Sequence, residues 1–177
     1  NDRGDSWEPI SGDLTRSENR IELPIMGKQQ SWDNPWDVGA MSHYNTITSL
    51  AESSLNDQLI YVGTDDGLIQ ITENGGKSWK KIDKIKGAPN QSYVNSVYLS
   101  QHDSNIIYAA FNHHKFGDFK PYIFVSNDKG NSWKSISSDL PCFWVLWRPS
   151  FRIHIIVFAK LFFNIKPCTK SSISSFF

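Results

Sequence analysis

The residues that most directly suggest catalysis are two adjacent carboxylates, Asp65 and Asp66. Glycosidases use a pair of carboxyl groups on either side of a bound sugar, one as an acid and the other as a base or a nucleophile. Neighbouring side chains at the end of a strand point apart, however, and Asp-Asp-Gly is an ordinary hairpin turn. We therefore expect a structural turn, keep ligand binding by these two residues as the alternative, and nominate no catalytic residue.

A second group with chemical potential is "NHHKFGDFK" at 112–120, which contains His113, His114 and Asp118. Imidazole and carboxylate groups bind metals, but no ligand spacing repeats here and adjacent His side chains diverge. We predict a solvated loop without a metal or another cofactor, in which His113 is a candidate for contacting a ligand.

Two tryptophans in "SWDNPWD", Trp32 and Trp36, are candidates for an aromatic platform that binds sugar rings, with Asp33 and Asp37 beside them. Aromatic side chains also anchor long loops through their large buried area. Both interpretations stay open at this point: a ligand-binding platform, or two anchors that hold a long loop against the fold.

The elements that must position these residues follow from an internal repeat. The stretch "ITSLAESSLNDQLIYV" (47–62) aligns without a gap with "VNSVYLSQHDSNIIYA" (94–109), at an offset of 47 residues. Each unit contains four short apolar and β-branched runs separated by Gly, Asn and Asp, which indicates antiparallel strands. The predicted strands are 47–52, 59–63, 68–72 and 78–82 in the first unit, and 94–100, 106–111, 121–126 and 132–137 in the second.

A turn motif joins the third and fourth strands of each unit. "SNDKGNSW" (126–133) is repeated as "TENGGKSW" (72–79) and, at the start of the chain, as "NDRGDSW" (1–7). Asp128 can accept hydrogen bonds from backbone N–H groups across the turn, Gly130 supplies a positive φ, and Trp133 should start the returning strand as a large buried anchor. The residues predicted to have this structural role are Asp2, Gly4, Ser6 and Trp7; Thr72, Asn74, Gly76, Ser78 and Trp79; and Ser126, Asp128, Gly130, Ser132 and Trp133.

The pattern Ser/Thr-x-Asp-x-Gly-x-Ser/Thr-Trp resembles the Asp-box of the BNR-repeat β-propeller family, which includes sialidases, xyloglucanase-like glycosidases and the sortilin luminal domain. The run "LIYVGTDDGLIQITENGGKSWKKI" (59–82) is most similar to bacterial sortilin-type or BNR-repeat glycosyl hydrolase proteins. The resemblance covers residues 1–140. It implies an extracellular or periplasmic location, and it implies that the boxes are structural and lie away from any active site.

We therefore predict an all-β fold, an incomplete β-propeller with two full four-stranded blades and the end of a preceding blade. The blades span about 47–82 and 94–137 within a domain at 1–140, and a long inter-blade loop spans 11–46. No Met and no signal-like segment stands at Asn1, so we expect the natural chain to begin earlier.

Charge and missing motifs limit the function further. Residues 1–140 carry 18 acidic and 13 basic residues, whereas residues 141–177 carry five basic residues and no acid, so the formal net charge is zero. The repeat region therefore has no basic surplus for nucleic acid. Sialidase chemistry, as the resemblance implies, gathers several arginines around a carboxylate, but residues 1–140 contain only Arg3, Arg16 and Arg20. We expect no catalysis by this chain, no nucleic acid and no membrane.

Two function hypotheses remain, and both place the function in the variable loops opposite the turn motif, at 64–67, 84–93 and 112–120 and in the long 11–46 loop. The first is a secreted sortilin-like binding or scaffold module for a peptide or carbohydrate ligand. The second is a piece of a polysaccharide-active glycoside hydrolase whose catalytic residues lie on other blades. In either case the remaining blades of the parent protein are partners.

Residues 141–177 do not continue the repeat, because they contain no glycine, no acid and no turn motif. We expect them to result from a shifted reading frame or a gene-model error, so the DNA read in another frame should resume a strand and a further motif. A membrane-spanning helix and a membrane-surface helix are the alternatives. The apolar run at 153–165 is short for a span and contains His154 and Lys160.

Overall fold

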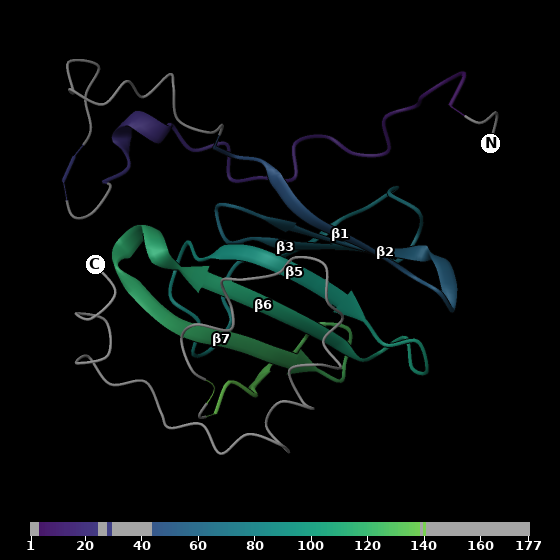
Figure 1. The fold of residues 1–177 in the computed structure, drawn as a ribbon. Coiled ribbons are helices and arrows are strands. Elements are labelled where there is room, and N and C mark those ends of the chain that lie inside the picture. Colours follow the sequence, from purple (N-terminus) through teal and green to yellow (C-terminus); the bar gives the residue numbers. More distant parts are fainter. Residues whose placement is uncertain (1–3, 25–27, 30–43, 139, 141–177) are drawn as a thin grey trace.

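The computed structural model describes residues 4–24, 28–29, 44–138 and 140. These residues form two four-stranded antiparallel sheets that are stacked one over the other (Figure 1). The first sheet consists of β1 (Ile47–Ser53), β2 (Asn56–Thr64), β3 (Ile69–Thr72) and β4 (Lys80–Ile82). The second consists of β5 (Tyr93–Leu99), β6 (Ile107–His113), β7 (Asp118–Ser126) and β8 (Lys134–Ser135). Two short 3-10 turns, η1 (Arg20–Glu22) and η3 (His114–Phe116), lie outside the sheets.

The two sheets are copies of one structural unit. In both, each strand pairs with the next one along the chain. The equivalence extends to an irregularity, because the pairing register shifts between Ile47 and Ser49 in β1 and between Val94 and Ser96 in β5. Such a shift marks a β-bulge, which bends its strand and increases the local twist. The bulge therefore belongs to the repeated unit.

The core lies between the two sheets, as expected for neighbouring propeller blades. Phe111 and Phe124 pack edge to face there, with ring centroids 5.8 Å apart. The hydroxyl of Thr48 donates a hydrogen bond to the Val94 carbonyl across the interface, at 2.6 Å. The predicted all-β propeller fold is confirmed. The buried residues of this core are Leu59, Tyr61, Ile69 and Ile71 from the first sheet, and Val94, Val97, Leu99, Ile107, Ala109, Phe111 and Phe124 from the second.

Residues 4–14 run along the outer face of the first sheet, as the purple segment in Figure 1 shows. A Cβ atom on Gly76 would lie 2.5 Å from the Ile10 carbonyl oxygen, and one on Gly130 would lie 2.7 Å from Cδ1 of Ile82. Ile10 and Ile82 each follow a motif tryptophan by three residues. The 4–14 segment therefore takes, toward the first sheet, the place that β4 takes toward the second.

The predicted strands agree with the observed ones to within three residues at each end, but the prediction of a loop at 112–120 is wrong. β6 continues to His113 and β7 begins at Asp118, so these two residues pair in an extended hairpin closed by η3. The error has a simple cause. Residues beyond Phe111 lie past the apolar core, so they lack the apolar alternation that identifies a half-buried strand.

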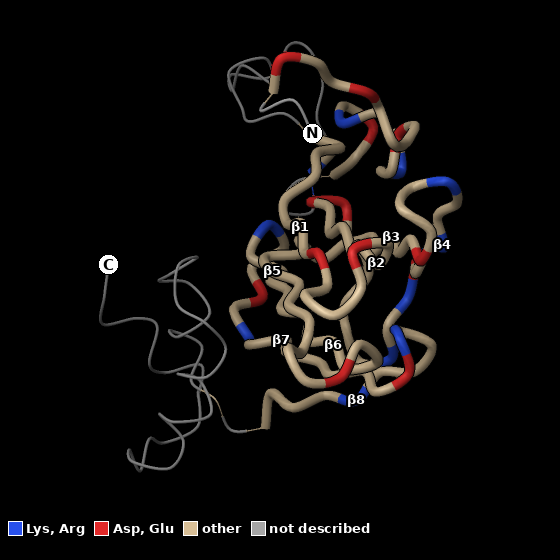
Figure 2. The backbone as a smooth tube through the Cα atoms, turned by 90° about the vertical axis from the view of Figure 1, so that its right-hand side faces the viewer, with Lys and Arg blue, Asp and Glu red and all other residues tan. Residues whose placement is uncertain are grey.

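Lysines mark the outer edge of the first sheet. Figure 2 shows basic residues along β4, which contains Lys80 and Lys81 and lies at the end of the strand order. Lysine side chains at a sheet edge discourage pairing with another chain. Among the described residues, no helix is long and apolar enough to span a membrane. The tail at 141–177 lies outside the described residues.

Candidate functional site

The polar groups at the two ends of the stacked sheets are used differently. The 72–79 and 126–133 turns lie at one end, and the antiparallel order places the β1–β2 and β5–β6 turns beside them. The other end, on the left of Figure 1, carries the 64–67 turn, the β6–β7 hairpin and the 44–46 segment. We call these the turn end and the loop end.

The 126–133 turn closes on its own side chains. The Asp128 carboxylate accepts hydrogen bonds from the Ser132 N–H at 2.8 Å, the Ser132 hydroxyl at 2.5 Å and the Ser126 hydroxyl at 2.7 Å. These bonds, those from Ser132 foremost, lower the pKa of Asp128 to about 2. Gly130 has a φ of +83° and its N–H donates to Ser126 Oγ at 2.8 Å. All of these hydrogen bonds lie within the turn, so the carboxylate has a structural role there.

The 72–79 turn has the same arrangement with an amide in place of the acid. Asn74 Oδ1 accepts from the Thr72 hydroxyl and from the Ser78 N–H, both at 2.9 Å, and its Nδ2 donates to Ser78 Oγ at 2.7 Å. Gly76 has a φ of +94° and its N–H donates to Thr72 Oγ1 at 2.9 Å. In the first copy Gly4 has the same φ of +94°, whereas Asp2 lies outside the described residues.

The motif tryptophans are less buried than the sequence predicts. Trp79 and Trp133 are half-buried, and Trp7 is 88% exposed. The indole N–H groups of Trp7 and Trp133 donate to the carbonyls of Gly4 and Gly130, both at 3.1 Å. Trp133 also packs against the edge of the core. The tryptophan therefore packs over its own turn, and the large buried anchor expected at Trp133 is only half-buried.

Asp65 and Asp66 are buried acceptors in the 64–67 turn. Asp65 accepts from the Thr46 N–H at 2.9 Å and the Thr46 hydroxyl at 3.1 Å. Asp66 accepts from the Arg16 N–H at 2.6 Å and also from the Thr64 hydroxyl. The two carboxylates thus bind different segments of the chain and do not face a common space.

Arg16 fastens the 13–18 segment to the first sheet. Its Nε donates to the Asp66 carbonyl at 2.9 Å, and its terminal nitrogen pairs with the Asp83 carboxylate. Gln70 adds a hydrogen bond from Nε2 to the Leu14 carbonyl at 3.0 Å. These contacts join residues 50 or more positions apart, and no local pattern in the sequence indicates them.

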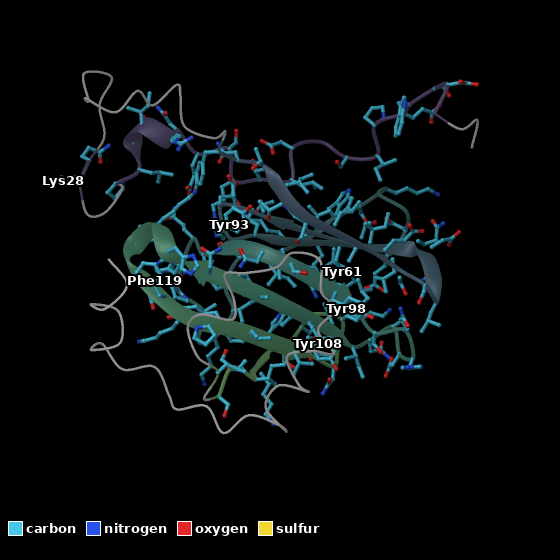
Figure 3. All side chains as sticks on the ribbon, viewed as in Figure 1. Lys28, Tyr61, Tyr93, Tyr98, Tyr108 and Phe119 are labelled. Atoms are coloured by element: carbon cyan, nitrogen blue, oxygen red, sulfur yellow. The ribbon has the colours of Figure 1, made fainter. Side chains whose placement is uncertain are left out.

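The β6–β7 hairpin ends in two exposed aromatic rings. Phe116 and Phe119 are 42% and 39% exposed. The Phe116 ring stacks on His113, with centroids 4.2 Å apart, and the Phe119 ring stacks on His114, with centroids 5.2 Å apart. Figure 3 labels Phe119 at the loop end, on the same side as Tyr93. We call His113, His114, Phe116 and Phe119 the hairpin tip.

Burial and hydrogen bonding set the charges at the hairpin tip. Burial lowers the pKa values of His113 and His114, although Asp118 acts in the opposite direction. Burial alone would raise the pKa of Asp118, but hydrogen bonds from the Tyr122 hydroxyl at 2.5 Å and the Lys120 N–H at 3.1 Å outweigh it and lower that pKa. Burial thus favours the neutral form of both imidazoles, which suits stacking on the phenylalanine rings.

Lys115 connects the hairpin tip to the loops of the first sheet. Its Nζ lies 4.7 Å from the centroid of the Tyr44 ring, a cation–π contact. Burial lowers the pKa of Lys115, and the charges of Asp65 and Asp66 oppose this effect. This contact thus joins the β6–β7 hairpin of the second sheet to the 44–46 segment that precedes β1.

The structure brings three of the predicted ligand-binding residues, Asp65, Asp66 and His113, to the loop end, but only His113 joins an exposed surface. Trp32 and Trp36 lie outside the described residues. Sequence reasoning missed Phe116 and Phe119, whose only signal is a pair of aromatic residues within a polar stretch. In the described part of the chain, no group of three or more His, Cys, Asp or Glu is placed to hold a metal ion.

The chain matches no protein-family model and no curated protein. Among solved structures it is similar to an ancestral GH74 enzyme, with 24% identity over 52% of this chain and 12% of that one, at a TM-score of 0.40. It is also similar to YCF48 from Cyanidioschyzon merolae, with 16% identity over 51% of this chain and 26% of that one, at a TM-score of 0.40. YCF48 bound to D1 peptide matches with 19% identity over the same shares, 51% and 26%, at a TM-score of 0.40. The chain thus spans about an eighth of the first protein and about a quarter of the other two.

Proposed function

We propose that this chain is part of a secreted, sortilin-like Asp-box β-propeller that binds a peptide or a glycan as a binding or scaffold module and catalyses no reaction itself. The observation that carries the proposal is the hairpin tip, where two exposed phenylalanine rings are each stacked on a histidine. Rings that are already fixed lose little conformational freedom on binding, so more of the contact energy appears as affinity. Aromatic faces also suit both apolar peptide side chains and the apolar faces of sugars.

The burial and hydrogen bonding of Asp65 and Asp66 support ligand binding rather than hydrolysis by this chain. A glycosidase needs two carboxyl groups about 5 Å or about 6.5–9.5 Å apart, with the sugar between them. Asp65 and Asp66 are both buried and are hydrogen-bonded to Thr46, Thr64 and Arg16. Neither carboxylate is open to a substrate, and their partners explain why two acids stand side by side in this turn.

The binding test compares the full chain with a Phe116→Ala/Phe119→Ala variant. Both proteins are screened against a peptide array and against a panel of β-glucans, xyloglucan and sialosides. Loss of the two rings should weaken binding to any captured ligand by at least about tenfold, the effect expected for an aromatic anchor. Leu55→Ala is the matched control, because Leu55 is exposed but lies in the β1–β2 turn at the turn end. Equal affinity of the double variant and the control would refute a ligand site at the hairpin tip.

A second arm tests the absence of catalysis. The full chain and an Asp65→Asn/Asp66→Asn variant are assayed for hydrolysis of the same glycans, and the melting temperature of each protein is measured. We expect no turnover by either protein and a lower melting temperature for the variant, because its buried hydrogen bonds are altered. Turnover by the unmodified chain that disappears in a folded variant would favour a glycosidase instead.

A further inference from the structure

The outer face of the first sheet, on the side away from the second sheet, exposes apolar side chains. Ile47 and Leu50 of β1 are 54% and 68% exposed. Leu50 pairs directly with Val62 of β2, so the two side chains lie on the same face. Residues 4–14 lie over Gln70 and Gly76 on this face, and Val62 of β2 is only 1% exposed, so Ile47 and Leu50 are its open part. We call Ile47, Leu50 and Val62 the leading face.

The repeat identifies what the leading face is built to contact. A shift of 47 residues converts Ile47, Leu50 and Val62 into Val94, Val97 and Ala109. These three counterparts are buried in the core, where the second sheet packs on the first. The bulges in β1 and β5 lie at equivalent positions as well, so the two faces share the same backbone irregularity and the same apolar character. The leading face is therefore an interface surface that lacks its sheet among the described residues.

The far side of the second sheet carries the complementary surface. Tyr98, Tyr108 and Val125 form one row across β5, β6 and β7, in which Tyr108 pairs with the other two. All three are half-buried, and we call them the trailing face. Figure 3 labels Tyr98 and Tyr108 on the second sheet, and Tyr61 in the core. The counterparts of the trailing face in the first sheet pack on the second sheet, and they are Ala51, Tyr61 and Ile71.

We propose that, where no further sheet of the same protein covers it, the leading face binds the trailing face of a second copy of this chain, so that copies associate head to tail. The contact repeats between two molecules the packing that joins the two sheets within one molecule. It buries Ile47 and Leu50, whose exposure otherwise costs free energy in water. Because the two partners use different surfaces, the contact is heterologous and can extend into a ring or a filament.

Residues 4–14 set the register of this contact. Ile10 over Gly76 and the Leu14 carbonyl bound to Gln70 occupy the place that a fourth strand of the incoming sheet would take. The fourth strand of the second sheet, β8, has only two residues. The incoming copy therefore contributes β5, β6 and β7, and the 4–14 segment remains in the fourth position.

The test uses two full-length variants, each altered on one face, and measures mass by light scattering and sedimentation velocity. Leu50→Lys changes the leading face and Tyr108→Lys changes the trailing face, and circular dichroism checks that both remain folded. Each variant alone should lose the associated species. An equimolar mixture should form a one-to-one dimer, because each variant retains the face that the other lacks. Leu55→Lys changes an exposed leucine outside both faces, 54% exposed against 68% for Leu50, and should associate like the unmodified chain.

Three results would overturn the proposal. The unmodified chain could remain monomeric at tens of micromolar. The two variants could be monomeric both alone and mixed, which would indicate a contact between identical surfaces. Both variants could associate or precipitate like the unmodified chain, which would show that neither face drives the association. If the unmodified chain precipitates while the variants stay soluble and dimerise on mixing, the head-to-tail contact is supported.

Discussion

Replacing Gly130 with alanine tests whether the 126–133 turn holds the two sheets together. Gly130 has a φ of +83°, a conformation that strains any residue with a Cβ atom. The added Cβ would also lie 2.7 Å from Cδ1 of Ile82 and 3.0 Å from Cδ1 of Ile71, both in the first sheet. The substitution therefore combines a local backbone cost with a clash between the sheets.

The backbone cost and the packing cost can be estimated separately. A left-handed conformation costs an alanine about 1–2 kcal/mol, and overpacking a well-filled contact costs about 1–3 kcal/mol. Gly130→Ala should thus lower the free energy of unfolding by about 2–5 kcal/mol in total. Gly117→Ala is the control, since Gly117 has a similar φ of +73° and no atom lies within 4 Å of the added Cβ. It should show the backbone cost alone.

Urea denaturation of the full chain, followed by circular dichroism and tryptophan fluorescence, measures both variants. With a urea m-value of about 2 kcal/mol/M, the extra cost should place the midpoint of Gly130→Ala about 0.5–1.5 M below that of Gly117→Ala. Equal midpoints for the two variants would mean that the turn does not press on the first sheet. The inferred role of the motif glycine in joining neighbouring sheets would then be wrong.

Three further predictions concern individual side chains. The pKa of Asp128 is held at about 2, below its unfolded value of about 3.9, so the Asp128 carboxylate should stabilise the fold fully above pH ~4 and lose this effect as the pH falls toward 2. Asp128→Asn, which copies Asn74, should remove this part of the pH dependence when the free energy of unfolding is measured in acid titrations. An unchanged profile would contradict this role of Asp128. Trp133→Ala should lower the free energy of unfolding by about 1.5–2.5 kcal/mol, roughly half the cost for a fully buried aromatic. Trp7→Ala removes an exposed side chain and should change the free energy of unfolding by less than about 0.5 kcal/mol. Equal effects of the two substitutions in urea titrations would refute the difference in burial. Arg16→Ala should cost about 1–3 kcal/mol, because the buried Asp66 carbonyl loses a donor and Asp83 loses its ion pair. It should also speed proteolysis within 4–24, and unchanged cleavage would show that Arg16 does not fasten this segment.

The strands could be predicted from the sequence because two independent signals agree. Apolar alternation marks each strand, and the repeat supports each assignment, at an offset of 47 residues for the first two strands and of 54 for the turn motif between the last two. The prediction failed where the alternation ends although the backbone pairing continues, as between His113 and Asp118. Backbone hydrogen bonds extend the hairpin there without help from apolar side chains. A hydrophobicity pattern therefore does not detect strand pairs that are held by backbone hydrogen bonds alone.

The candidate site could be predicted less well from the sequence, because segments that are far apart along the chain form it. Asp65 and Asp66 attract attention as neighbours, but their partners Thr46 and Arg16 lie 19 and 50 residues away. A catalytic pair and a structural pair look alike until those partners are known. The hairpin tip has the opposite problem. His113 stacks on Phe116 within a single turn, yet the sequence does not show whether the rings face each other or separate.

The turn motif also explains why its copies vary at one position and keep the next. Gly75 and Lys129 have φ values of +67° and +53°, and the glycines that follow them have +94° and +83°. Each turn therefore needs two successive left-handed residues. The first faces only the end of a flexible side chain, as Gly75 faces Gln58, so a lysine is tolerated at the equivalent position 129. The second lies against the neighbouring segment or sheet: a Cβ atom on Gly76 would lie 2.5 Å from the Ile10 carbonyl oxygen, and one on Gly130 would lie 2.7 Å from Cδ1 of Ile82. The larger positive φ at the second position and the packing against the neighbouring segment or sheet both favour glycine there.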